Sequence, residues 1–209
     1  AGVFAMASGA CVVLIGYNAG RARRVKRGIV NICVFCGSGS SIGEPYSSAA
    51  CSFGQAMAAR GHALVFGGYD TGLMGVVARA VHDAGGRVVG VVPSGLDAFR
   101  GRPAFPCDDL IDAADLSERK AFMSQRADAF AALPGSYGTL DELYSELANQ
   151  KIATEKKPVG VLNVGGFYDT LETLHATIVR EGFMTESDGR LAMFAQDSDT
   201  LLDLLEGRR

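Results

Sequence analysis

Two runs, Val88-Val89-Gly90-Val91-Val92 and Val159-Gly160-Val161-Leu162, decide the fold class. Neither run has a polar face, which is typical of strands that helices cover on both sides. Outward from these runs, short apolar segments alternate with amphipathic segments along the chain. Alternation at this spacing predicts right-handed strand–helix–strand units and therefore a parallel sheet. We expect an α/β chain with a Rossmann-like, doubly wound parallel sheet, helices on both faces, and a single domain.

The expected elements alternate from residue 31 onward, and no internal repeat or linker interrupts them. The apolar runs predict strands over residues 31–36, 63–66, 87–92, 110–113, 129–133 and 159–162. The amphipathic segments predict helices over residues 45–60, 73–84, 116–127, 139–152 and 167–181.

The length and composition fit one folded domain. A chain of 209 residues with 48% hydrophobic and 21% charged residues can bury a core without disulfides or a structural metal. Its 20 Lys and Arg against 23 Asp and Glu give a net charge of −3, so the chain as a whole lacks the electrostatic signature of nucleic-acid binding. We expect no nucleic-acid partner.

The cysteines favour reduced thiols in a cytoplasm. They number five and are scattered, which argues against a secreted disulfide framework. Cys33 and Cys36 form a C-x-x-C, but it lies within the expected strand 31–36. Residues three apart on a strand point to opposite faces, so this pair is not expected to hold zinc or to act as a redox pair. The three histidines are isolated, and we expect no metal and no cofactor.

The first 28 residues differ from the rest. An apolar stretch over residues 1–17 is followed by five basic residues within 21–27, whereas a secretory signal places its charges before the apolar part. The stretch contains Ser8 and three glycines and is too short for a good membrane span. We expect residues 1–28 to be a disordered or non-native tail with no membrane role, and residues 29–209 to form the domain.

Glycine is over-represented, at 27 of 209 residues, and much of the excess lies in three turns after expected strands. The turns are CGSGSS (36–41), FGGYDTGLMG (66–75) and LPGSYGT (133–139). One such turn alone could serve only close helix–strand packing. Three turns at the carboxyl edge of a parallel sheet, each opening a helix, predict a nucleotide or sugar-phosphate site. Neither G-x-G-x-x-G nor G-x-x-x-x-G-K-[ST] occurs, so a P-loop NTPase is not expected. The site is expected to hold a nucleotide as a substrate, which need not be NAD or ATP.

Two charged residues near these turns each allow two interpretations. Thr139-Leu140-Asp141-Glu142 has the form of a capping box, yet Glu142 could also polarise a water or stabilise an oxocarbenium-like transition state. Ser117-Glu118-Arg119-Lys120 could be a capped, solvated helix start. Because Arg119 and Lys120 oppose the helix dipole there, a bound anion would also explain them.

Together these residues resemble the Lonely Guy family of cytokinin riboside 5′-monophosphate phosphoribohydrolases, often labelled lysine-decarboxylase-like. The family motif P-G-G-x-G-T-x-x-E corresponds to PGSYGTLDE over residues 134–142, and Glu118-Arg119-Lys120 matches the companion Arg-Lys motif. The resemblance continues from residues 33–38 through Gly72-Leu73-Met74-Gly75 to residues 157–164.

The resemblance implies hydrolysis of the N-glycosidic bond of an N6-substituted adenosine 5′-monophosphate, which releases the free base and ribose 5-phosphate. It implies Arg119 and Glu142 as the catalytic pair, an AMP-type nucleotide as the small-molecule partner, and a homodimer. The glycine-rich turns and the resemblance together place substrate binding at Ser38, Gly68, Gly72, Met74, Lys120, Pro134, Gly135, Ser136, Tyr137, Gly138, Thr139 and Asp141.

Several positions depart from the family pattern, and other functions stay open. Ser136 replaces the second glycine of the motif, Tyr69 the third glycine of a G-G-G turn, and Ser117 a histidine, while residues 148–153 differ beside the base pocket. The alternatives are a hydrolase of plain AMP or another nucleoside monophosphate, and a non-catalytic nucleotide sensor. Lysine decarboxylation would need a Schiff-base lysine with pyridoxal phosphate, and no lysine has supporting context.

Overall fold

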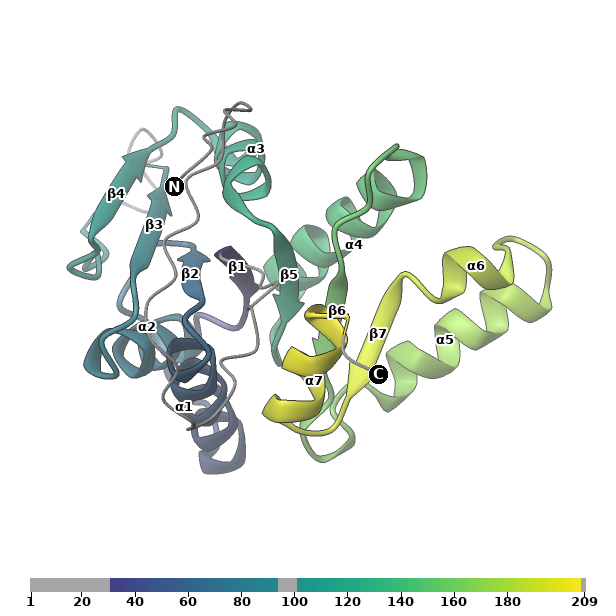
Figure 1. Ribbon diagram of the computed structural model, residues 1–209, viewed down its shortest axis with the longest axis horizontal. Coiled ribbons are helices and arrows are strands. Elements are labelled where there is room, and N and C mark those ends of the chain that lie inside the picture. The colour runs from purple at the N-terminus through teal and green to yellow at the C-terminus, as the bar shows by residue number, and fades with distance from the viewer. Residues whose placement is uncertain (1–30, 94–100, 208–209) are drawn as a thin grey trace, which may run out of the picture.

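A computed structural model describes residues 31–93 and 101–207 and shows one sheet of seven strands (Figure 1). The strand order is β4-β3-β2-β1-β5-β6-β7, and every neighbouring pair is parallel. The strands are β1 (Asn31–Phe35), β2 (Ala63–Phe66), β3 (Val88–Val92), β4 (Asp109–Asp112), β5 (Ala129–Ala132), β6 (Val159–Leu162) and β7 (Ala192–Ala195). The parallel sheet is confirmed, whereas the expected tail 1–28 lies outside the described residues.

Among the described residues, helices lie in the connections between successive strands except between β3 and β4, and α7 follows β7. They are α1 (Glu44–Ala59), α2 (Gly72–Asp83), α3 (Leu116–Arg126), α4 (Tyr137–Ile152), α5 (Asp169–Arg180), α6 (Glu186–Gly189) and α7 (Ser198–Leu205), with the short 3-10 helix η2 at Val164–Gly166.

Helices cover both faces of the sheet, as expected of a doubly wound fold. Side chains of α1, α2 and α7 form one apolar core with one face of the strands, including the fully buried Phe53 and Leu201. Side chains of α3 and α4 form the other core around Phe130 and Leu143. Each of the two deciding runs is buried at every position, which confirms that they are central strands.

The carboxyl-terminal part was under-predicted. The strand β7 and the helices α6 and α7 lie beyond the last expected helix. β7 is a four-residue edge strand with two partly exposed residues, so its pattern is too short to stand out. Elsewhere the boundaries differ from the expected ones by one or two residues.

The C-x-x-C is split between the two cores. Cys33 packs in the core beneath α3 and α4, and Cys36 packs in the core beneath α1 and α2. Both thiols are free and buried, and burial raises the pKa of each, so both stay protonated. The expectation that they face opposite sides of the strand is confirmed.

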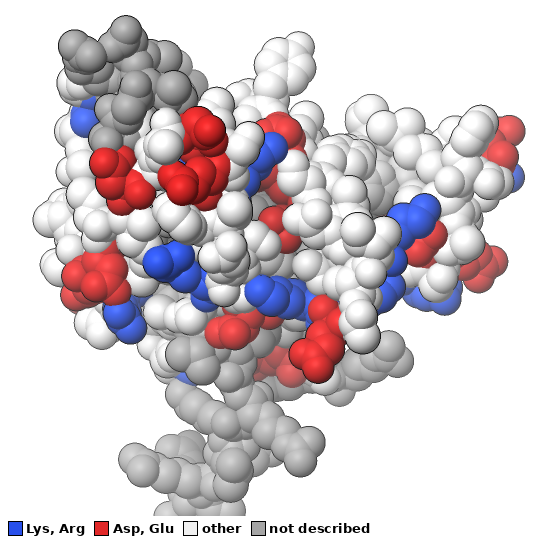
Figure 2. Space-filling view, turned by 90° about the horizontal axis from the view of Figure 1, so that it is seen from above, with Lys and Arg blue, Asp and Glu red and all other residues white. Residues whose placement is uncertain are grey.

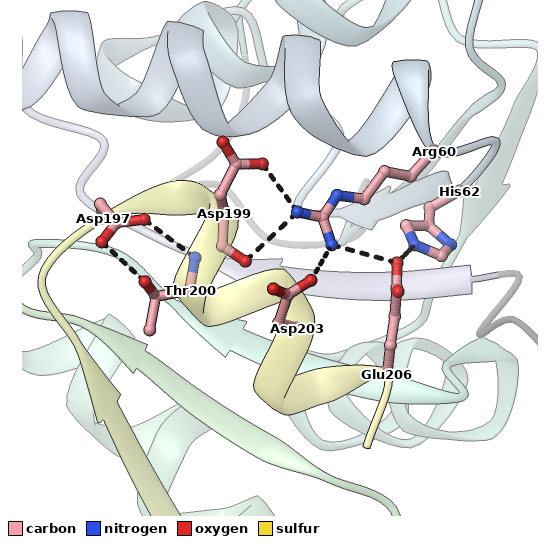
Figure 3. A network of polar contacts seen from close by, with 7 residues as sticks. All are labelled: Arg60, His62, Asp197, Asp199, Thr200, Asp203 and Glu206. Atoms are coloured by element: carbon pink, nitrogen blue, oxygen red, sulfur yellow. Dashed lines mark hydrogen bonds and ion pairs between the residues drawn. The ribbon is translucent and has the colours of Figure 1, made fainter. Parts of the chain in front are cut away.

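An ionic cluster attaches α7 to the end of α1 (Figure 3). Arg60 donates to Asp203 at 2.6 Å and to Asp199 at 2.7 Å, and Nε2 of His62 lies 2.8 Å from Oε1 of Glu206. The Glu206 side chain is 1% exposed and that of Asp199 is 79% exposed, so one cluster contains both a buried and a solvated carboxylate. His62 immediately precedes β2, so the cluster lies at the amino end of the strands, away from the glycine-rich turns.

No helix within residues 31–93 and 101–207 is long and apolar enough to cross a membrane.

Candidate active site

The three glycine-rich turns meet at the carboxyl ends of β1, β2 and β5. The amide of Gly37 donates to the carbonyl of Pro134 at 3.0 Å, and the amide of Leu73 donates to the carbonyl of Gly37 at 2.8 Å. β1 lies between β2 and β5, where the order of the strands along the chain reverses. Ligands of open α/β sheets bind at this switch point, so the sequence placed the turns correctly at one edge.

Two glycines allow the close approach of these segments. Gly72 has φ of +53°, and a Cβ there would lie 2.6 Å from the carbonyl oxygen of Gly39, so a side chain would push the first and second turns apart. A Cβ on Gly67 would lie 2.1 Å from a terminal nitrogen of Arg119. The missing side chain at Gly67 therefore makes room for a guanidinium group.

Arg119 lies at the start of α3 but is not solvated. The helix is capped as one interpretation expected, because Asp115 accepts from the Glu118 amide at 2.8 Å and Glu118 accepts from the Ala114 amide at 2.6 Å. Arg119 itself is only 9% exposed, and its Nε donates to the carbonyl of Val91 at 2.9 Å. Of the two interpretations, the solvated arginine is therefore wrong, because the side chain runs inward over the end of β3.

Glu142 is not part of a capping box. The helix α4 begins at Tyr137 with Ser136 as its N-cap, so Thr139 is the third helical residue and Glu142 the sixth. Oε1 of Glu142 accepts from a terminal nitrogen of Arg119 at 2.8 Å. The capping interpretation is wrong because the helix starts two residues before the expected start, at a Tyr-Gly pair that reads as a turn.

Burial and the neighbouring arginine act in opposite directions on the pKa of Glu142. The Glu142 side chain is 13% exposed, and burial raises its pKa, while the Arg119 charge and hydrogen bond oppose that rise. A carboxylate that is buried beside a single guanidinium ion is a candidate for acid–base or electrostatic work.

A cavity of about 300 Å³ surrounds this pair, between the three turns and the starts of α3 and α4. Most of the predicted site residues line it, namely Ser38, Met74, Arg119, Lys120, Ser136, Gly138, Thr139, Asp141 and Glu142. A larger hollow of about 850 Å³ between α5, α6 and β7 contains none of them.

Five predicted residues do not line the cavity. Gly68 packs against Val92 and Gly72 against the first turn, while Pro134 and Gly135, within the third turn, pack against Gly37 and Thr139. Tyr137 is 90% exposed. These residues support or flank the cavity. The glycines among them lie where close packing leaves no room for a side chain.

The cavity also contains residues that sequence reasoning did not assign to the site. They include Gly67, Tyr69, Arg102, Leu116 and Met123. A signal existed for Gly67 and Tyr69, which lie in the second glycine-rich turn. None existed for Arg102, which lies in an aperiodic segment held to that turn by bonds from the Asp70 amide to the Pro103 carbonyl and from the Phe105 amide to the Gly68 carbonyl, each at 2.9 Å.

Charges of both signs gather around the cavity. Lys120 Nζ lies 2.9 Å from a carboxylate oxygen of Asp141 and 3.2 Å from the Ser145 hydroxyl, which joins α3 to α4. Three cations, Arg102, Arg119 and Lys120, line the cavity beside the two carboxylates. Figure 2 shows the molecule from above the view of Figure 1, with basic and acidic side chains of the described residues interspersed on this side. This balance suits a small anionic ligand better than a polyanion.

Within residues 31–93 and 101–207, no group of three or more His, Cys, Asp or Glu side chains is placed to hold a metal ion.

Solved structures share the fold. The molybdenum cofactor binding protein from Rippkaea orientalis matches with a TM-score of 0.65 and 21% identity, covering 87% of this chain and 98% of that one. The molybdenum cofactor carrier protein from Chlamydomonas reinhardtii matches with a TM-score of 0.65 and 19% identity, covering 86% and 97%. At these identities the likeness shows the fold alone.

Similarity in sequence is higher to plant enzymes. The chain is 42% identical over 175 residues to cytokinin riboside 5′-monophosphate phosphoribohydrolase LOG2 of Arabidopsis thaliana, covering 84% of this chain and 82% of the relative. It is 42% identical over 175 residues to the enzyme LOG of Oryza sativa subsp. japonica, covering 84% and 72%. The family model described as "Possible lysine decarboxylase" matches residues 74–205. The chain therefore belongs to this family, which includes the cytokinin riboside 5′-monophosphate phosphoribohydrolases.

Proposed function

We propose that this protein hydrolyses the N-glycosidic bond of a cytokinin riboside 5′-monophosphate. The products are the free base and ribose 5-phosphate. The observation that carries the proposal is the buried ion pair between Arg119 and Glu142 at the junction of three glycine-rich turns. The names of the plant relatives support the reaction and the substrate class.

The pair supplies the chemistry of the proposed reaction. The bond from ribose C1′ to the base nitrogen breaks, water adds to C1′, and the departing base takes up a proton. Positive charge develops on the ribose ring as the bond breaks, and an ionised Glu142 stabilises that charge or accepts a proton from the attacking water. Arg119, held by the Val91 carbonyl, favours the ionised form of the carboxylate and orients it.

The turns and nearby cations supply the binding. The 5′-phosphate is proposed to lie against the third turn and the start of α4, where Ser136, Gly138 and Thr139 line the cavity. Lys120 and Arg102 add positive charge at the same cavity. Ser38 and Met74 line it from the first two turns and complete the substrate site.

Two other functions can be separated by observation. A hydrolase of plain AMP would use the same pair and differ only at the base side. A nucleotide sensor would have no use for a buried Arg119–Glu142 pair in its cavity. Lysine decarboxylation, which the family description names, needs a lysine free to form a Schiff base. Lys120, which lines this cavity, is paired with Asp141.

The deciding experiment is an assay of released base. Purified protein is incubated with isopentenyladenosine monophosphate and with AMP, and adenine and isopentenyladenine are quantified by chromatography. Turnover of the isopentenyl substrate at the higher kcat/KM supports the proposal. Preference for AMP favours the second function, and binding without turnover of either substrate favours the sensor.

We also propose a homodimer that works in a cytoplasm. The helix α2 buries its large apolar residues, whereas α4 exposes Tyr137 at 90% and Ile152 at 84%. An α4 surface that another subunit covers would bury these side chains. Light scattering of the purified chain should give about twice the monomer mass of 21.9 kDa, and a stable monomer would contradict the proposal.

A further inference from the structure

The side chain of Tyr168 reaches the backbone of the third glycine-rich turn. Tyr168 immediately precedes α5, is 4% exposed, and does not line the cavity. Its hydroxyl donates to the carbonyl of Leu133 at 2.8 Å, and the backbone of Gly135 faces the same hydroxyl. The hydroxyl therefore lies against the two residues on either side of Pro134.

This contact adds to the bonds that hold residues 133–135, among them the bond from the Leu133 amide to the Phe35 carbonyl at 2.9 Å. Pro134 has no amide hydrogen, and its carbonyl accepts from the Gly37 amide at 3.0 Å. The turn is thus held from the first turn on one side and from Tyr168 on the other. Burial raises the pKa of the Tyr168 hydroxyl, so the group stays protonated and continues to donate.

The position of the third glycine-rich turn determines that of the start of α4, because the two pack directly against each other. A Cβ on Gly135 would lie 2.1 Å from Oγ1 of Thr139, so the backbone of the turn packs directly against the first helical turn. Thr139 is 3% exposed and cannot move aside into solvent. Glu142 follows three residues later on the same helix. A displacement of the turn therefore reaches the residues that line the cavity.

Tyr168 is itself held from the sheet. Its amide donates to Oδ1 of Asn163 at 2.7 Å, and Nδ2 of Asn163 donates to Asp169 at 2.7 Å. Asn163 is completely buried, and its own amide donates to the carbonyl of Ala195 at the end of β7. Through these bonds, the position of the Tyr168 hydroxyl is fixed relative to β6 and β7.

We propose that Tyr168 is a positioning residue for the phosphate-binding turn. Its hydroxyl holds residues 133–135 in the shape in which the turn and the start of α4 bind the 5′-phosphate. Tyr168 contacts no substrate, and the inference rests on the proposed function.

The test compares Tyr168→Phe with Tyr144→Phe. Each variant removes one hydrogen-bonded hydroxyl and keeps the ring, but the Tyr144 hydroxyl contacts His175 at 3.0 Å and does not line the cavity. Without its restraint the turn binds phosphate less well, so in Tyr168→Phe the KM for the monophosphate and the inhibition constant of ribose 5-phosphate should both rise about tenfold. Tyr144→Phe should leave both constants unchanged.

A purely structural role predicts a different result. Tyr168→Phe would then lower the melting temperature and the active fraction, and so kcat, but would leave KM and the inhibition constant at wild-type values. That result overturns the inference. If the wild-type protein hydrolyses no nucleoside monophosphate, the proposed function fails instead, and the inhibition constant is replaced by the directly measured Kd of ribose 5-phosphate.

A second variant covers the case in which Tyr168→Phe does not fold. Asp169 is exposed, so Asp169→Ala preserves the core while it releases Nδ2 of Asn163. We expect a smaller rise in the same two constants. Wild-type values for Asp169→Ala, with a melting temperature lowered by loss of the bond, would overturn the inference.

Discussion

Gly67 and Arg119 are in such close contact that no side chain fits between them. A Cβ on Gly67 would lie 2.1 Å from a terminal guanidinium nitrogen and 2.9 Å from the sulfur of Met74. The guanidinium group occupies this space while it donates to Glu142 at 2.8 Å. The position of the proposed catalytic arginine therefore depends on the space that the missing side chain of Gly67 leaves in the second glycine-rich turn.

Gly67→Ala should therefore impair catalysis more than folding. The clashing nitrogen is at the far end of a flexible side chain, so a small shift of the Arg119 guanidinium relieves the clash and leaves the fold in place. A displacement of about 1 Å in a catalytic group can lower the rate by about a hundredfold, and we expect a fall of that order in kcat. Gly43→Ala is the matched control, because its Cβ would meet only ordinary contacts at 3.8 Å. Equal kinetics in the two variants would show that Arg119 does not need this space.

Glu142→Gln tests the carboxylate itself. The amide keeps an oxygen that can accept from Arg119, so we expect the fold and nucleotide binding to persist while kcat falls at least about a hundredfold. Calorimetric titration with AMP and single-turnover assays separate binding from chemistry. Glu155→Gln, at an exposed position, is the control. Normal turnover of Glu142→Gln would remove this residue from the mechanism.

The pH dependence of stability should change when the arginine is removed. Arg119→Ala leaves Glu142 buried without its cation, and the loss of one partner of a buried pair costs about 3–5 kcal/mol. Because Arg119 holds down a pKa that burial raises, that pKa rises further in the variant. A raised native pKa means that the folded state binds the proton more tightly than the unfolded state, so stability falls as pH increases through this range.

Urea unfolding of Arg119→Ala and wild type at pH 5 and pH 8 measures this effect. The stability difference between the two proteins should be smaller at pH 5, where Glu142 of the variant is more often protonated. If the difference in unfolding free energy between the two proteins is the same at both pH values, Glu142 in the variant is hydrated or has another partner.

The ionic cluster at α7 offers a test of burial within one network (Figure 3). Glu206→Ala removes a carboxylate that is 1% exposed and leaves Arg60 and His62 without it, so we expect a loss of about 3 kcal/mol. Asp199→Ala removes one that is 79% exposed and should cost less than about 1 kcal/mol. Chemical unfolding measures the loss of stability in both variants. Similar losses would show that solvent exposure does not determine how much each carboxylate contributes to stability.

The sequence predicted those elements whose burial gives a recognisable pattern of apolar residues. Residues 87–92 were identified as a strand because the run from Val88 to Val92 has no polar face, and the turns were placed at one edge because all strands are parallel. The start of α4 was missed because Tyr137 and Gly138 resemble a turn, which made Thr139 seem to be a cap. Arg102 gave no signal, because its place depends on backbone bonds between segments that are distant in sequence. The pairing of Arg119 with Glu142 was reached through a family resemblance, not from spacing.

The last prediction concerns the 5′-phosphate and Ser136. If the turns bind an anion, the monophosphate should be hydrolysed far better than the same nucleoside. Loss of one charge-assisted hydrogen bond costs about 1.5–3 kcal/mol, and several would be lost together. Each 1.4 kcal/mol is about a factor of ten, so we expect at least about a thousandfold discrimination in kcat/KM between AMP and adenosine.

Ser136 should contribute part of this discrimination. It lines the cavity and is the N-cap of α4, with extended backbone, yet its side chain makes no capping hydrogen bond. The hydroxyl is therefore not needed by the helix, and we expect it to bind the phosphate. Ser136→Gly should lower the ratio of kcat/KM for AMP to that for adenosine by about tenfold, the value of one such bond, with adenosine hydrolysis unchanged. A higher ratio in the glycine variant would mean instead that the Ser136 side chain narrows the turn. Equal rates on AMP and adenosine in the wild type would mean that the turns serve packing and that the enzyme is a plain nucleosidase.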